Sequence, residues 1–180
     1  MTDEEILSSI PPRLPSARLL WTAIIDVGDR TDLEKSPLGH RNMVPIPGEH
    51  FYGGRAFEDL SGAVLPGGAD RQLMRADGIK ELDALYEMRT DRGDVLTIGN
   101  NVIVDETRQP ERYAMSVITV TAPMGKVDWL NRRLVLGTLQ TARPKRQAVV
   151  VRAWLADNLP GLSASKRHSE YLRKCHRRTR

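Results

Sequence analysis

The sequence has one cysteine, no long apolar run and no basic leader, and each lack excludes a class of protein. Cys175 alone cannot close an internal disulfide or supply a cysteine-based zinc site. No apolar stretch approaches the roughly 18 residues that a membrane helix needs. The first five residues, MTDEE, are acidic where a secretory signal is basic and then apolar. We therefore expect a soluble, cytoplasmic protein with no membrane partner.

A net positive charge is found only in the last twenty residues. Seven of the 27 lysines and arginines lie at 161–180 beside one of the 23 acidic residues, so this segment carries +6. The other 160 residues hold 20 basic and 22 acidic side chains, a net charge of −2. A near-neutral body has no general attraction for a phosphate backbone. Nucleic acid is therefore not an expected partner, apart from weak, salt-sensitive binding by the basic tail.

Length and patterning predict one folded domain with two appendages. The 180 residues suffice for one self-supporting core. Thr2 and Glu5 have capping-box spacing, and Pro11 and Pro12 stop the helix after about two turns. The expected parts are an N-terminal arm at 1–16, a β-barrel domain at 17–158 and a basic, disordered tail at 159–180.

Apolar residues in the body repeat every second position, the period of a β-strand. Alternation is clear from Leu19 to Val27, from Leu82 to Thr90 and from Tyr113 to Thr121. Asp77-Gly78 predicts a hairpin turn, and the polar stretch Gly28–Pro37 predicts a loop. We count eight to ten strands, with one short helical turn near 125–131. The prediction is an all-β, antiparallel β-barrel, whose interior can hold one small ligand.

Several motifs between Leu38 and Asn131 resemble those of a family known as domain of unknown function 3237, small barrel proteins of bacteria and fungi. The motifs are Gly39-His40-Arg41, Pro45-Ile46-Pro47-Gly48-Glu49-His50-Phe51, Gly62-Ala63-Val64-Leu65-Pro66-Gly67-Gly68-Ala69-Asp70, Leu82-Asp83-Ala84-Leu85-Tyr86, Thr90-Asp91-Arg92-Gly93, Gly99-Asn100 and Trp129-Leu130-Asn131. The resemblance covers roughly Leu19 to Leu155. It implies an antiparallel barrel related in shape to calycin and allene-oxide-cyclase barrels, and it implies no particular reaction.

The chain departs from the family pattern at two positions that matter for a pocket. Arg71 stands where the family usually has tryptophan, and Glu49-His50 replaces a usual glycine-threonine pair before Phe51. A changed pocket rim is the simplest interpretation, so a substrate preference cannot be transferred from the family.

Asp70 is the first candidate for catalysis. It follows Pro66-Gly67-Gly68, a bend of the kind that redirects side chains beside active sites. A carboxylate in an apolar barrel would have a raised pKa and could act as a general base. The alternative is that Asp70 only caps the glycine bend through the backbone.

His50 and Arg41 are the other catalytic candidates. Histidine titrates near neutral pH and can transfer protons, although a lone histidine near a bend is more often a structural hydrogen-bonder. Arg41 could anchor a carboxylate or stabilise an oxyanion. An ion pair between Arg41 and Asp70 or Asp91 is an equally good interpretation.

The predicted substrate-binding residues are mainly aromatic. Tyr86 could point its hydroxyl at a ligand or could be a core aromatic, and Trp129 could stack on a ligand or close the barrel end. The full set is Glu49, Phe51, Tyr86, Trp129 and Asn131. Only one of Glu49 and His50 can enter the pocket, because neighbours in a strand face opposite sides.

No motif for a cofactor, a metal or a covalent nucleophile stands out. The sequence has no spaced His-Glu-x-x-His, no glycine-rich loop opening a helix and no Gly-x-Ser-x-Gly. The leading hypothesis is a cofactor-independent enzyme, an isomerase, cyclase or lyase, moving protons on a small apolar carbonyl, phenolic or lactone metabolite. The alternative is a lipocalin-like binding protein that performs no chemistry. A homodimer is the expected assembly on general frequency.

Overall fold

The computed structural model describes residues 1–107, 110 and 112–158. The basic tail predicted at 159–180 lies outside the described residues. The helical elements are α1 (Asp3–Ser9) and the 3₁₀ helices η1 (Glu58–Leu60) and η2 (Asp128–Arg132). The strands are β1 (Ser16–Asp26), β2 (Thr31–Ser36), β3 (Gly39–Ile46), β4 (Gly48–Gly53), β5 (Gly62–Val64), β6 (Gly68–Met74), β7 (Ile79–Thr90), β8 (Val95–Asp105), β9 (Tyr113–Thr121), β10 (Val135–Thr141) and β11 (Ala148–Asp157).

The chain divides into two units, of which Arg18–Leu155 holds the barrel. The other unit comprises Met1–Ala17 and the chain from Ala156 onward. Within it, α1 has the expected capping box: the Thr2 hydroxyl accepts from the Glu5 amide, and the Glu5 carboxylate accepts from the Thr2 amide. Every residue of α1 is exposed, so its first turn depends on this cap.

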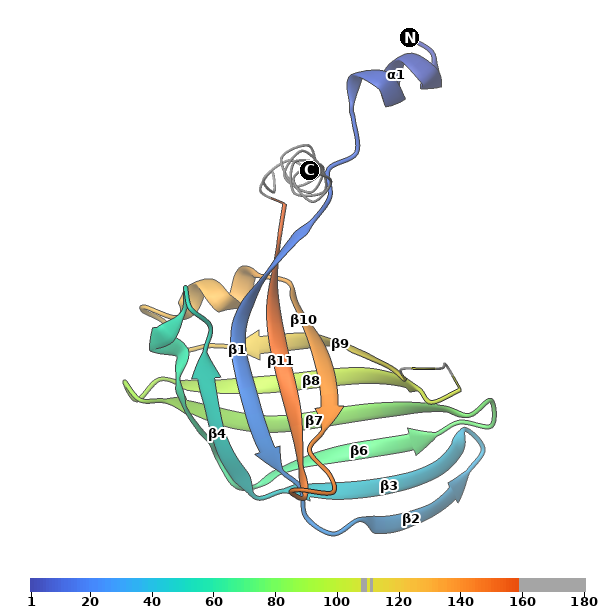
Figure 1. Cartoon of the computed structure of the whole chain (residues 1–180), viewed down its shortest axis with the longest axis vertical. Helices are drawn as coiled ribbons and strands as arrows, with labels where there is room; N and C mark the ends of the chain where they lie inside the picture. Colours follow the sequence, from blue (N-terminus) through green and yellow to red (C-terminus); the bar gives the residue numbers. More distant parts are fainter. Residues whose placement is uncertain (108–109, 111, 159–180) are drawn as a thin grey trace, which may run out of the picture. The chain divides into compact units, whose positions relative to one another are not determined.

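Eight strands close into an antiparallel barrel. They follow each other around the ring in the order β7, β5, β4, β1, β11, β10, β9 and β8, and pairing of β7 with β8 closes it. The remaining strands extend one side, since β6 pairs with β7, β3 with β6 and β2 with β3. In Figure 1, β1, β10 and β11 cross the direction of β6, β7 and β8. The predicted all-β barrel is confirmed, together with its short helical turn at Asp128–Arg132.

Two glycine-containing breaks explain why there are more strand segments than predicted. β3 and β4 are separated at Pro47, where proline removes a backbone donor. Gly48 then has φ +126°, and a Cβ there would lie 2.7 Å from the Val64 carbonyl oxygen. β5 and β6 are likewise separated by Leu65–Gly67. Each break bends one long strand so that both of its halves stay in the sheet.

The prediction of a loop over Gly28–Pro37 is wrong, because Thr31–Ser36 forms β2. This strand lies at one end of the strand order and pairs only with β3. Five of its six residues are exposed, so it has no buried face and therefore no apolar alternation. Glu34 has φ +65° and the register shifts between Asp32 and Lys35, which is a bulge. Charged and bulged edge strands of this kind resist pairing with other chains.

One half of the barrel interior is tightly packed. Its largest side chains are fully buried: Trp21, Phe51, Met88, Leu96, Leu130 and Val135. The Trp21 and Phe51 rings meet edge to face, with centroids 6.4 Å apart. These side chains come from several strands of the ring and, in the case of Leu130, from η2, and together they close one end of the barrel.

Candidate functional site

The other half of the interior encloses a cavity of about 560 Å³. This volume is in the range of sites for drug-sized molecules. Its lining comes from the ends of β1, β3, β6, β7, β8, β10 and β11, with the connections that follow β1 and β10. The interior positions here include the small side chain of Ala84 and the polar side chains of Asp70, Gln72 and Asn100.

A row of interior residues crosses four neighbouring strands and forms a polar wall. Val44 of β3 pairs with Asp70 of β6, Asp70 with Ala84 of β7, and Ala84 with Asn100 of β8. Asp70 and Asn100 are two strand spacings apart, about 10 Å. The small Ala84 between them leaves space that both polar side chains can face.

Three buried polar atoms of this wall have no hydrogen-bond partner among the described residues. They are Asp70 Oδ1, the Tyr86 hydroxyl and Asn100 Oδ1. All three residues line the cavity. A buried polar group without a partner costs about 1–3 kcal/mol, so such groups are rare unless they have a use. Hydrogen bonds to a bound molecule would satisfy all three.

The environment of Asp70 favours its protonated form. Burial raises the pKa of the Asp70 carboxyl above the ordinary value of 3.8, and the nearby Asp83 adds to the rise. The largest opposing influence is a hydrogen bond of 2.6 Å from the Gln72 side-chain amide to Asp70 Oδ2, and the positive charge of Lys80 acts in the same direction. Oδ2 is therefore held in place by protein, while Oδ1 is available to a ligand.

Tyr86 marks the border between the cavity and the packed half. Its side chain is 1% exposed, and burial raises the pKa of its hydroxyl. The hydroxyl therefore stays protonated and is available as a donor. Gly68 on the neighbouring strand makes room for it, because a Cβ there would lie 2.5 Å from Tyr86 Cβ.

The opposite wall of the cavity is apolar. It is formed by side chains of β1, β10 and β11 and the residues next to them: Ile25, Val27, Leu139, Val149 and Val151. A ligand that fits both walls has a largely apolar body with polar atoms along one side. This is the composition expected of a specific small-molecule site, where a few polar groups fix orientation.

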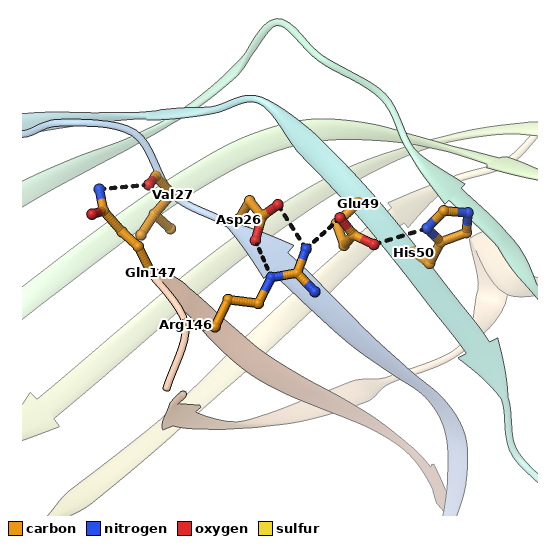
Figure 2. Close-up of polar contacts among 6 residues, drawn as sticks. All are labelled: Asp26, Val27, Glu49, His50, Arg146 and Gln147. Atoms are coloured by element: carbon orange, nitrogen blue, oxygen red, sulfur yellow. Dashed lines mark hydrogen bonds and ion pairs between the residues drawn. The ribbon is translucent and has the colours of Figure 1, made fainter. Parts of the chain in front are cut away.

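An ion-pair network holds the β10–β11 connection against β1 and β4, next to the cavity-lining residues Val27 and Gln147 (Figure 2). Arg146 donates to both carboxylate oxygens of Asp26, at 2.7 and 2.8 Å, and also to Glu49. The guanidinium lowers the pKa of the Asp26 carboxyl. Gln147, which lines the cavity, donates from its side-chain amide to the Val27 carbonyl oxygen at 3.0 Å.

The structure separates the three residues predicted to be catalytic. Asp70 lines the cavity, but His50 and Arg41 do not. His50 is exposed, with Nδ1 3.0 Å from the Glu49 carboxylate (Figure 2). The Arg41 side chain is exposed and donates to the Leu33 carbonyl oxygen at 2.9 Å. Among the described residues Arg41 forms no ion pair, with Asp70, Asp91 or any other carboxylate. Catalysis by any of these residues stays a prediction.

The predicted substrate-binding residues are also dispersed. Tyr86 lines the cavity, Phe51 is buried in the packed half, and Glu49 belongs to the ion-pair network. Trp129 stacks on Phe57 with centroids 5.8 Å apart, beside a second hollow of about 500 Å³. The Asn131 side chain bonds to backbone atoms of Ala122 and Asp128. Ligand binding by each of them stays a prediction.

Sequence reasoning missed most polar residues of the cavity, among them Gln72, Lys80, Asn100 and Arg143. Two of them had a usable signal. Asn100 lies two residues from Ile98 and two from Val102, on the apolar face of its strand. Lys80 continues the series Leu82, Ala84 and Tyr86 by one step. A polar residue on the inward face of a strand is a better site signal than a residue beside a turn.

The described residues contain neither a cluster of metal ligands nor a helix that could span a membrane. Within residues 1–107, 110 and 112–158, no three histidine, cysteine, aspartate or glutamate side chains gather to hold a metal ion. None of the helices in these ranges is long and apolar enough to cross a bilayer.

The fold and the cavity define a closed antiparallel β-barrel with a two-sided internal pocket. The chain belongs to the family described as protein of unknown function DUF3237, whose model matches residues 15–156. A UPF0311 protein of Rhodopseudomonas palustris is 36% identical over 83 residues, 46% of this chain and 52% of the relative. The chain thus spans about half the length of the curated relatives it matches in sequence.

Solved structures share the fold over most of the chain. The crystal structure of that Rhodopseudomonas palustris protein, a conserved protein of unknown function, has a TM-score of 0.71 at 24% identity and covers 81% of this chain and 100% of its own. A beta-barrel like protein from Acinetobacter baumannii has a TM-score of 0.71 at 22% identity, covering 82% and 99%. An enzyme from Penicillium herquei has a TM-score of 0.65 at 20% identity, covering 84% and 100%. At these identities the likeness shows the fold alone.

Proposed function

We propose that the protein is a cofactor-independent barrel enzyme that moves protons on a small, largely apolar carbonyl, phenolic or lactone metabolite. The observation that carries this proposal is Asp70 Oδ1, a buried carboxylate oxygen on the wall of the cavity that has no hydrogen-bond partner among the described residues. The structural neighbour from Penicillium herquei is described as an enzyme, which is consistent with catalysis in a barrel of this fold.

The chemistry that these residues can perform is general acid–base catalysis. Asp70 accepts a proton from a carbon next to a carbonyl, and the electron pair of that bond moves to the carbonyl oxygen. The Tyr86 hydroxyl donates a hydrogen bond to the oxygen as charge develops there. Asp70 then returns the proton to another atom of the substrate, which completes an isomerisation. The raised pKa of the Asp70 carboxyl makes its ionised form a stronger base than an ordinary aspartate.

Exchange of carbon-bound protons with D₂O tests this proposal without knowledge of the natural substrate. The probes are 1-indanone, α-tetralone and 3,4-dihydrocoumarin, followed by proton NMR. We expect the protein to accelerate exchange at the carbon beside the carbonyl of at least one probe. Asp70→Asn should lower the accelerated rate about 100-fold or more, the usual contribution of a general base.

Asp91→Asn is the matched control, because Asp91 is an exposed carboxylate at the turn between β7 and β8 and does not line the cavity. It makes the same change of charge outside the cavity and should leave exchange unaltered. Exchange that is equally fast in Asp70→Asn and in the unaltered protein would show that Asp70 is not the base.

The alternative is a lipocalin-like protein that binds a hydrophobic molecule and does not alter it. The apolar wall of β1, β10 and β11 favours this alternative, because such a surface binds without contributing to chemistry. Probes that bind, by line broadening in the same NMR experiment, and yet exchange no faster than in buffer would support it. A cytoplasmic location and a homodimer stay predictions under either function.

A further inference from the structure

The cavity lining is rich in positive charge. It includes two carboxylates, Asp29 and Asp70, and four basic side chains: Arg30, Lys80, Arg112 and Arg143. The first 160 residues together carry a net charge of −2, so the excess at the cavity is local. Low-dielectric walls strengthen the field of charges gathered around a cleft. The lining therefore attracts anions.

Among the described residues, the carboxylate that pairs with Lys80 is shared with a second cation. Its position in β7, two residues from Leu82 and four from Ala84, places it on the interior face, and it is 26% exposed. The ammonium lies 3.5 Å from Glu106, and Arg112 approaches the same carboxylate oxygen at 3.7 Å. One carboxylate shared by two cations leaves positive charge uncompensated.

Arg143 faces the cavity from the connection between β10 and β11. Within the part of the chain that the structure describes, its guanidinium has no hydrogen bond or ion pair. The connection is held at the Ala142 end by backbone bonds to Ala148 and Arg146, of 2.9 and 3.2 Å. The ion pairs of Arg146 with Asp26 and Glu49 fix the other end (Figure 2). The network thus fixes the backbone that carries Arg143 beside the cavity.

We propose that the ligand is a small organic acid, bound with its carboxylate between Lys80 and Arg143 and its neutral polar end at Asp70 and Tyr86. This inference rests on the proposed function, since it names the ligand class for the same cavity. Lys80 is four residues from Ala84, the register partner of Asp70, and four strand residues span about 13 Å. A two-ring molecule with polar groups at both ends matches this span once the Lys80 side chain reaches inward.

Two probes that differ only in charge test the proposal: 6-hydroxy-2-naphthoic acid and its methyl ester. Their binding is followed by naphthalene fluorescence and by calorimetry at low salt. We expect the acid to bind at least tenfold more tightly than the ester, as charge-assisted hydrogen bonds usually provide. Added salt should weaken binding of the acid and leave binding of the ester unchanged. Equal affinities for acid and ester would overturn the proposal.

Matched variants locate the charge effect. Lys80→Gln and Arg143→Gln should each weaken binding of the acid several-fold and leave binding of the ester unchanged. Lys80→Arg should retain binding of the acid. Arg133→Gln is the control, because Arg133 is exposed just before β10 whereas Arg143 follows its other end. If Arg133→Gln weakens the acid as much as Arg143→Gln does, general charge rather than a site explains the binding.

The outcomes separate this proposal from the proposed function. Equal binding of acid and ester, with proton exchange still dependent on Asp70, would overturn the organic-acid ligand and leave the enzyme intact. Tight acid binding with no exchange on any probe would retain the ligand class and favour the binding protein. Failure of both naphthalene probes to bind at millimolar concentration would overturn the carboxylate site.

Discussion

The two halves of the barrel interior are built by the same strands with very different side chains. Along β7, Met88 is fully buried in the packed half, whereas Ala84 and Leu82 line the cavity. Along β8, Leu96 occupies the packed half and Asn100 the cavity. Alternation directs all of these residues inward, but side-chain volume and polarity decide whether a segment is core or site. A ligand cavity in a small barrel therefore forms where the inward-facing side chains are too small to fill the interior.

Shortening one leucine in each half should reveal the largest difference between them. Leu96→Ala removes a fully buried side chain from close packing, so we expect a loss of about 3–4 kcal/mol of unfolding free energy. Leu82→Ala borders existing free space, where the lost contacts are fewer, and should cost about 1–2 kcal/mol. Urea denaturation measures both. Equal losses would mean that the cavity half is as well packed as the other.

Enlarging one alanine in each half makes the converse test. Ala84→Phe should fill the space between Asp70 and Asn100, abolish binding of 6-hydroxy-2-naphthoic acid and its ester, and change stability by less than about 1 kcal/mol. Ala153→Phe should cost about 1–3 kcal/mol, because Ala153 is fully buried and does not line the cavity. Undiminished probe binding in Ala84→Phe would place the ligand outside this cavity.

The smallest expected effect is a gain of stability in Asp70→Asn at neutral pH. Burial raises the pKa of Asp70 above 3.8, so the folded state binds more protons than the unfolded state between those two values. Stability therefore falls as the pH rises through that interval, and the full penalty persists above it. Asp70→Asn removes this penalty and should be more stable at pH 7 by on the order of 1 kcal/mol.

Urea denaturation at several pH values measures this gain, which should vanish near pH 3, where Asp70 is protonated in both states. Asp91→Asn, at the exposed turn between β7 and β8, should show no comparable gain. A stability difference for Asp70→Asn that does not vary with pH would contradict a carboxyl with a raised pKa in the cavity.

Sequence reasoning succeeded where one face of a strand is buried and failed where neither is. The alternation from Tyr113 to Thr121 predicted β9 with its observed bounds. β2 escaped prediction because Thr31–Ser36 is exposed on both faces, so backbone pairing with β3 alone makes it a strand. A pairing that depends on a distant partner leaves no periodic pattern.

Site prediction followed a similar division. Asp70 and Tyr86 were singled out and line the cavity, because a bend motif and an alternating strand set their orientation. Glu49 and His50 were singled out for their chemistry, yet Arg146, 97 residues from Glu49 in the chain, holds the Glu49 carboxylate. No feature of the sequence around Glu49 indicates that partner.

By itself the sequence determined that the chain forms an antiparallel barrel and which residues of an alternating strand share a face. Both properties follow from short-range alternation and turn chemistry, and these act over a few residues. Only the tertiary structure decided that Asp70, Tyr86 and Asn100 share one wall and that Lys80 and Arg143 line the same cavity. Strand register and barrel closure bring those residues together, because they add up the geometry of all the strands and no single segment encodes them.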